Sequence, residues 1–221
     1  MDETLQLPRT TARPTVVERP AGVRRVLLDS GYSISAFFLA IPALVLVTVG
    51  LALGAGLLIL IAGFFVLVVT TYVARGFAYA ERARLRSMKG VDDPTPTYAV
   101  SQAGAGPLRR ALTALRDPQS WLDVVWALVG WVTATFAFAV TLAWWAAAAG
   151  GLSYWYWERF IDFGPNNTTL AELTGLGEGR TPEIWLNLAI GTFALITIPL
   201  ATRLVAALHA GLARMLLTSR G

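Results

Sequence analysis

One uninterrupted apolar stretch constrains this chain more than any other feature: residues 33–74 include no acidic or basic side chain. The stretch is about 42 residues long, whereas an α-helix needs only about 20 apolar residues to cross a bilayer. A single helix of that length would overshoot the hydrocarbon core about twofold. The stretch therefore predicts two membrane-spanning helices, at about 33–52 and 56–75, joined by a turn within the glycine-rich segment 50–56.

Two further apolar blocks, 124–149 and 184–202, predict a third and a fourth spanning helix. Asp117 and Pro118 precede the third block, where an N-cap and a first-turn proline are expected. Composition agrees, because 55% of the residues are hydrophobic and only 14% are charged, against roughly a quarter charged in soluble domains. We therefore expect an all-α membrane protein whose four transmembrane helices form two helical hairpins, with Pro42 bending the first helix.

Basic residues are distributed unevenly among the segments that connect these blocks. Segment 75–123 is rich in Arg and Lys, whereas the loop 150–183 has two arginines among several acidic residues. Cytoplasmic loops have the excess of Lys and Arg, so both termini are predicted to be cytoplasmic and 150–183 to be the outer loop of a plasma-membrane protein. The polar, proline-containing residues 1–24 predict a disordered cytoplasmic tail, and residues 25–217 form the predicted four-helix domain.

The two predicted hairpins resemble each other in sequence. An Arg, an Ala and a second Arg recur at one constant offset after the second and fourth spans, as Arg75, Ala78, Arg86 and as Arg203, Ala206, Arg214. The segments that lead into the first and third spans, 29–32 and 120–123, are also related. Both copies would begin and end in the cytoplasm, which predicts a parallel repeat about an axis along the membrane normal. Chance similarity between Ala- and Arg-rich segments is the alternative.

The segments that follow the second and fourth spans have the pattern of amphipathic juxtamembrane helices. Arg75, Arg82 and Arg86 share one side of such a helix, and helices of this kind lie at the interface and pair their cations with anionic lipids. With Arg203 and Arg214, these residues are candidate lipid contacts that anchor the topology. The alternative function is a relay of movement to a cytoplasmic partner.

Aromatic residues are concentrated at the start of the outer loop. Trp155 and Trp157 stand beside Glu158, and Asp162 follows shortly after. Tryptophan and tyrosine at the water boundary are typical of the interfacial aromatic belt of membrane proteins. A surface for a cationic or amphiphilic ligand is the alternative, because aromatic faces and carboxylates attract cations.

Features of enzymes and of ion-coupled transporters are missing from the sequence. No charged residue lies centrally in any predicted span, where proton relays and most coupled transporters need one. The sequence has no phosphate-binding loop, nucleophile elbow or zinc-ligand spacing, and it contains no cysteine. The only histidine, His209, is expected to have a packing or interfacial role. We therefore expect no catalytic residue, metal, cofactor or nucleic-acid partner.

Three motifs in a fixed order resemble a known family. They are RGFAYAERA at 75–83, KGVDDPTP at 89–96 and LRDPQSWLD at 115–123. Together with the two hairpins, they resemble the sensor domain found at the N-terminus of actinobacterial two-component histidine kinases. The resemblance covers about residues 25–217. It implies signal input, and in that family a helix with a phospho-accepting histidine and an ATP-binding domain follow the membrane module.

The sequence thus favours a non-catalytic membrane sensor that binds the lipid bilayer. No phospho-accepting histidine motif or nucleotide site is present, so the output is expected on a longer chain or on a partner histidine kinase or other signalling protein. Kinase modules usually work as dimers, which suggests a homodimer. The alternative function is a subunit of a membrane transport or lipid-handling complex.

Overall fold

The computed structural model describes residues 22–89, 96, 98–101, 104, 106–161 and 168–218. In this part of the chain every regular element is a helix. The elements are α1 (Val23–Gly56), η1 (Leu58–Leu60), α2 (Ala62–Lys89), α3 (Pro107–Arg116), α4 (Pro118–Leu152), α5 (Tyr154–Trp157), η2 (Glu158–Phe160), α6 (Leu170–Leu173) and α7 (Arg180–Leu217). The predicted tail lies, up to residue 21, outside the described residues.

Four of these helices, α1, α2, α4 and α7, are long and apolar enough to cross a membrane. The prediction of a four-helix, multi-pass membrane protein is confirmed to this extent. The helices α1, α4 and α7 have 34, 35 and 38 residues, which at 1.5 Å per residue makes each of them longer than about 50 Å. Since the hydrocarbon core is about 30 Å thick, each helix must extend well beyond it. The segments after the second and fourth predicted spans continue α2 and α7 without a break.

The turn of the first hairpin lies later than predicted. The helix α1 continues to Gly56, and the chain reverses at 57–61, where Ile61 has a positive φ of 60°. The glycines serve close packing instead: a Cβ at Gly50 would lie 2.2 Å from the Thr70 hydroxyl oxygen, and one at Gly54 would meet the Leu67 side chain. The sequence pattern predicts a turn here because glycine weakens an isolated helix. In the structure these glycines instead allow α2 to approach α1 closely.

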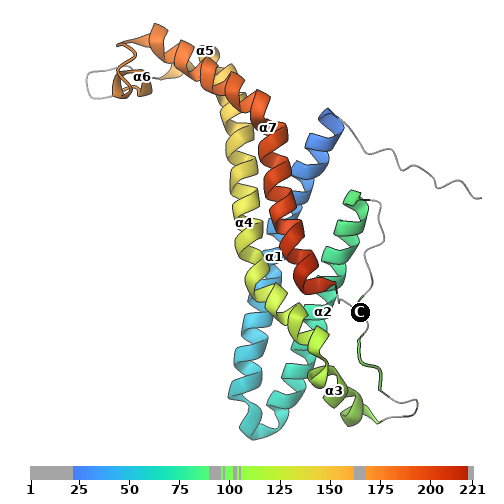
Figure 1. Ribbon diagram of the computed structural model, residues 1–221. Coiled ribbons are helices and arrows are strands. Elements are labelled where there is room, and N and C mark those ends of the chain that lie inside the picture. The colour runs from blue at the N-terminus through green and yellow to red at the C-terminus, as the bar shows by residue number, and fades with distance from the viewer. Residues whose placement is uncertain are drawn as a thin grey trace, which may run out of the picture.

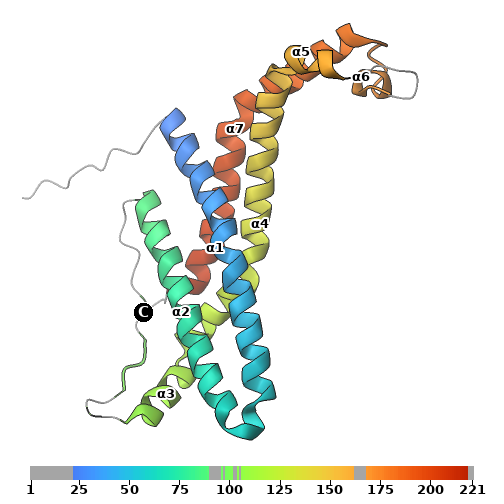
Figure 2. The ribbon, with the colours of Figure 1, turned by 180° about the vertical axis from the view of Figure 1, so that it is seen from behind.

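The two hairpins point in opposite directions (Figures 1 and 2). The turn between α1 and α2 lies at one end of the molecule, and the segment between α4 and α7 lies at the other. Along the seam, α1 runs antiparallel to α4: Trp145 donates to the Ser30 hydroxyl at 3.0 Å, and the rings of Phe37 and Phe138 stack 4.4 Å apart. The predicted parallel arrangement of the two copies is therefore not the arrangement that this structure has. The repeat of the two hairpins in sequence stays a prediction.

The hairpin of α4 and α7 is closed by two glycines. A Cβ at Gly151 would lie 2.7 Å from the Gly191 backbone, and a Cβ at Gly191 would lie 2.6 Å from the Leu152 nitrogen. A side chain at either glycine would force α4 and α7 apart. In lipid there is no hydrophobic driving force between helices, so close van der Waals packing must hold them together, and small residues at such a crossing allow it.

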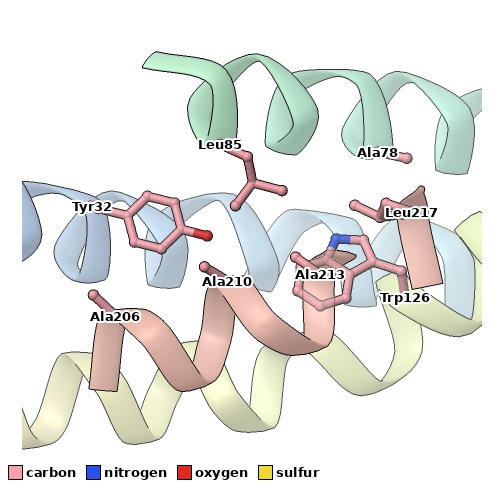
Figure 3. Close-up of a cluster of buried hydrophobic side chains, with 8 residues drawn as sticks. All are labelled: Tyr32, Ala78, Leu85, Trp126, Ala206, Ala210, Ala213 and Leu217. Carbon is pink, nitrogen blue, oxygen red and sulfur yellow. The ribbon is translucent and has the colours of Figure 1, made fainter. Parts of the chain in front are cut away.

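The hairpins meet in a buried cluster to which all four long helices contribute (Figure 3). Tyr32 of α1 and Trp126 of α4 are its aromatic members. The other members, small or aliphatic, are Ala78, Leu85, Ala206, Ala210, Ala213 and Leu217. Alanines on α7 keep the backbones close, so polar side chains near this cluster are also withdrawn from solvent and lipid. Large exposed apolar residues lie on both hairpins instead, as lipid-facing surfaces require.

Candidate functional site

The aromatic residues of α5 form an exposed surface. Trp155 and Trp157 in α5 are 58% and 55% exposed. The Glu158 carboxylate lies 3.6 Å from the Arg180 guanidinium. This contact pairs the acid that would attract a cationic ligand in the alternative interpretation. Asp162 lies outside the described residues. This arrangement fits an interfacial aromatic belt.

Arg75 joins the end of the first hairpin to the start of the second. Its guanidinium lies 2.9 Å from the Asp117 carboxylate and donates through Nε to the Ser120 hydroxyl at 2.9 Å. It also lies over the ring of Tyr98, 4.3 Å from the centroid. Asp117 has a second role, because it caps α4 by accepting from the Ser120 backbone N–H. The Asp117 carboxylate therefore both caps the N-terminus of α4 and binds α2 through Arg75.

Arg82 lies about two helical turns beyond Arg75 on α2. It is buried and has three hydrogen-bond partners. It lies 2.5 Å from Asp123, donates to the Leu217 carbonyl at 2.9 Å and donates to the Tyr98 hydroxyl at 2.7 Å. Tyr98 in turn donates to Asp123 at 2.6 Å. Burial, reinforced by this hydrogen bond to Asp123, raises the pKa of Tyr98 to about 12. The guanidinium thus connects α2 to α4 and to the end of α7.

The remaining predicted arginines are less deeply placed. Arg86 is half-buried on α2, one turn beyond Arg82, and Arg214 is half-buried near the end of α7. Arg203 is exposed on α7 and interacts electrostatically with Asp29 of α1. The structure brings Arg75 and Arg82 into one polar zone with the start of α4. It does not gather all five arginines on one lipid-facing surface.

Glu81 is the centre of a second buried polar group. Its carboxylate accepts from the Tyr32 hydroxyl at 2.6 Å and pairs with Arg84 on its own helix. Arg84 also donates to the Tyr32 carbonyl at 2.7 Å. Glu81 is only 2% exposed, so the acid is stable as an anion only because of these partners.

His209 of α7 faces Glu81 across the interface. The His209 side chain is 1% exposed, and its Nε2 lies 3.6 Å from the Glu81 carboxylate. On its other side, Nδ1 lies 2.8 Å from the Thr133 hydroxyl of α4. The ring packs against Trp126 and Tyr32, with centroids 5.2 and 5.6 Å away. His209 is thus packed as expected, but within a polar group that the sequence did not predict.

The acidic and tyrosine partners were missed, although the sequence contains a signal for them. The offset that relates Arg75 to Arg203 also relates Glu81 to His209, so the two facing residues occupy matched positions in the repeat. Among the described residues, no group of three or more His, Cys, Asp or Glu side chains is arranged to hold a metal ion. The arrangement offers ion pairs and proton-binding groups between helices.

A comparison with protein-family models matches residues 32–217 to a family described as Putative sensor. The match includes α2, α4, α1 from Tyr32 onward and α7. It also includes every polar contact between these helices described above, with the exceptions of those of Asp29 and Ser30. No curated protein matches the chain. No solved structure matches it either.

Proposed function

Because the chain belongs to the family described as Putative sensor, we propose that it is a non-catalytic signal-input module of a membrane. The observation that supports this best is the polar zone between hairpins. Arg75 and Arg82 link α2 to the start of α4, and Arg82 also binds the last turn of α7. A change in hairpin packing would therefore move the ends of α2 and α7 together.

A buried ion pair is suited to a two-state arrangement. Removing one partner of such a pair costs about 3–5 kcal/mol, whereas replacing the whole pair by apolar groups is often neutral. The main effect of the pair between Arg82 and Asp123 is therefore to specify that α2 packs against α4. Its net contribution to stability is small. A cue shifts the balance between two packings only if it binds one of them better. In this proposal, the intact polar zone is one of the two states.

We place both termini, together with this polar zone, on the cytoplasmic side of the plasma membrane. The charge distribution supports this orientation. The contacts agree with it, because the described ion pairs between helices, those of Arg75, Arg82 and His209, join segments that this orientation puts on one side. The pairs of Arg25 and Arg84 lie within α1 and α2 on that same side. The pair between Glu158 and Arg180 belongs to the outer loop.

This orientation has a consequence for the seam between α1 and α4. If both connections, the α1–α2 turn and the α4–α7 loop, lie on the outer side, both hairpins must point the same way in the bilayer, whereas the connections lie at opposite ends in Figure 1. If the hairpins kept that arrangement, α2 and α4 would run in the same direction, and segment 90–117 with its arginines would have to cross the membrane. Each central arginine costs about 2.5–3.5 kcal/mol. We therefore propose that the polar contacts persist in the bilayer and that the contacts of Trp145 with Ser30 and of Phe37 with Phe138 are exchanged.

The proposed output partner is a histidine kinase of a two-component system, of the kind known in actinobacteria, working with a homodimer of this chain. The test is a mild-detergent pull-down of the tagged chain from native membranes. Recovery of a histidine kinase or response regulator is expected, with the yield changed by Asp123→Asn and unchanged by Glu178→Gln, an exposed acid of the outer segment. Recovery of a permease or ATPase without a signalling protein would favour a transport or lipid-handling complex instead.

A further inference from the structure

A small cavity lies where α1, α2, α4 and α7 meet. Its free space is about 20 Å³, which is enough for a single water molecule. Phe77, Trp126 and Trp131 are among its apolar lining residues, and its two ionisable lining residues are Glu81 and His209. A water molecule in a mostly apolar cavity needs polar partners, and these two side chains would supply them.

One nitrogen of His209 has no hydrogen-bond partner. Nε2 is buried and lies 3.6 Å from the nearest Glu81 oxygen, which is too long for a hydrogen bond. The Thr133 hydroxyl lies 2.8 Å from Nδ1 and 3.1 Å from the Gly130 carbonyl. When its single proton goes to Gly130, Nδ1 must be the donor to Thr133. In that case a neutral ring presents the bare Nε2 lone pair to a carboxylate, which is unfavourable.

A proton on Nε2 removes this conflict. The ring would then donate at both nitrogens, to Thr133 and to Glu81. A charge-assisted N–H···O bond is about 2.8 Å long, so α7 and α2 would have to draw closer than they are now. A water molecule held in the cavity would bridge the two groups while they are apart.

We propose that Glu81 and His209 form a proton-binding site, and that proton uptake by His209 tightens the contact between the two hairpins. The proton comes from bulk water and adds to the Nε2 lone pair, and no other bond forms or breaks. This inference rests on the proposed sensor function and names acidity as its cue. Histidine is the side chain whose charge ordinarily changes between about pH 5 and 8.

Every helix packed against the site contributes a group that affects this proton. Tyr32 of α1 donates to Glu81, and Arg84 of α2 pairs with Glu81. Arg214 of α7 acts electrostatically on Tyr32, while α4 contributes the neutral Thr133 and Trp126. The two arginines oppose a further positive charge, but the Glu81 carboxylate is directly opposite Nε2 and favours it.

The first test uses the fact that His209 is the only histidine of the chain. With ¹⁵N-histidine labelling and an affinity tag free of histidine, NMR in nanodiscs would report this one imidazole. We expect its ¹⁵N signals to show proton uptake as the pH is lowered from about 8 to about 5. Glu81→Gln should lower its proton affinity about tenfold or more, while Glu172→Gln, a remote carboxylate, should leave it unchanged. A wild-type ring that keeps one protonation state throughout that range would overturn the proposal, whether or not the variant folds.

The second test measures the movement. The chain has no native cysteine, so spin labels at Tyr79→Cys and Met215→Cys, two exposed positions on α2 and α7, report one distance. That distance should shift between about pH 8 and pH 5.5 and stay fixed in His209→Gln. A shift that persists in His209→Gln, or no shift in the parent, would refute the proton site. If a kinase is still recovered in the pull-down, the sensor function stands without acidity as its cue, whereas movement without any signalling partner would refute the sensor function alone.

Discussion

At the residue scale, the most informative feature is that charged side chains are used in pairs between helices. Arg82 and Asp123 are both buried, and their partners complete the hydrogen bonding of the guanidinium. An isolated buried charge would be too costly to retain. The pair therefore requires the matching surfaces of α2, α4 and α7 to be present together.

Asp123→Asn should lower the free energy of unfolding by about 3–5 kcal/mol, because it leaves Arg82 as an uncompensated buried charge. Thermal unfolding in nanodiscs would measure the change. The control is Glu178→Gln, which makes the same chemical change at an exposed position and should stay within about 0.5 kcal/mol of the parent. The double replacement Arg82→Met with Asp123→Leu should recover most of the loss. A double variant as unstable as the single one would contradict this interpretation.

The stability contribution of Tyr98 should depend on pH. Burial raises its pKa from the ordinary value of 10.0 to about 12, so the folded chain favours the neutral phenol. This contribution to stability is complete below about pH 10 and is lost as the pH rises through about 12. The tyrosinate absorbance of the parent minus that of Tyr98→Phe should therefore titrate near pH 12. A difference curve centred near pH 10 would show that the hydroxyl is not held by Asp123.

At the scale of elements, glycines determine how closely helices pack. Gly151 and Gly191 bring α4 and α7 into backbone contact. Gly50 and Gly54 of α1 leave room for the Thr70 and Leu67 side chains of α2. The same residue type has two opposite effects, since it weakens an isolated helix but improves packing between helices. Which effect dominates depends on the neighbouring helix, which is not visible in a local sequence pattern.

Gly151→Leu should separate α4 from α7 and lower the unfolding temperature in nanodiscs, because the new side chain would collide with the Gly191 backbone. Gly150→Leu is the matched control: its Cβ meets nothing within 4 Å, so the same side chain one position earlier should be tolerated. Equal effects of the two substitutions would mean that the glycine contact does not hold the hairpin together.

Much of the fold, but less of the site, could be predicted from the sequence. The four spanning helices follow from apolar length alone, and Asp117 is the predicted helix cap. The turn at 57–61 was misplaced because the glycines were interpreted without their packing partner. Arg75 and Arg82 were identified as important, but their partners Asp117, Ser120 and Asp123 are distant in sequence. The contact between Glu81 and His209 depends on how the two hairpins meet, which a single sequence does not specify.

At the scale of the whole molecule, two apolar hairpins meet around one polar zone. The hairpins interact with lipid, and the polar zone joins the continuations of α2 and α7 to the beginnings of α1 and α4. A cue that changes hairpin packing would therefore shift the ends of both α2 and α7. For this coupling, the polar zone must lie on one side of the membrane, and the α1–α2 turn and the α4–α7 loop must both lie on the other side.

The most direct test of this claim is the accessibility of single cysteines to a membrane-impermeant maleimide in intact cells. Ile59→Cys in the first turn and Leu176→Cys in the second outer segment should both be labelled from outside, since both positions are exposed. Ser87→Cys and Met215→Cys, exposed near the ends of α2 and α7, should be labelled only after permeabilisation. Labelling of Ile59→Cys and Leu176→Cys from opposite sides would contradict the account and would show that the opposed hairpins of Figure 1 persist in the membrane.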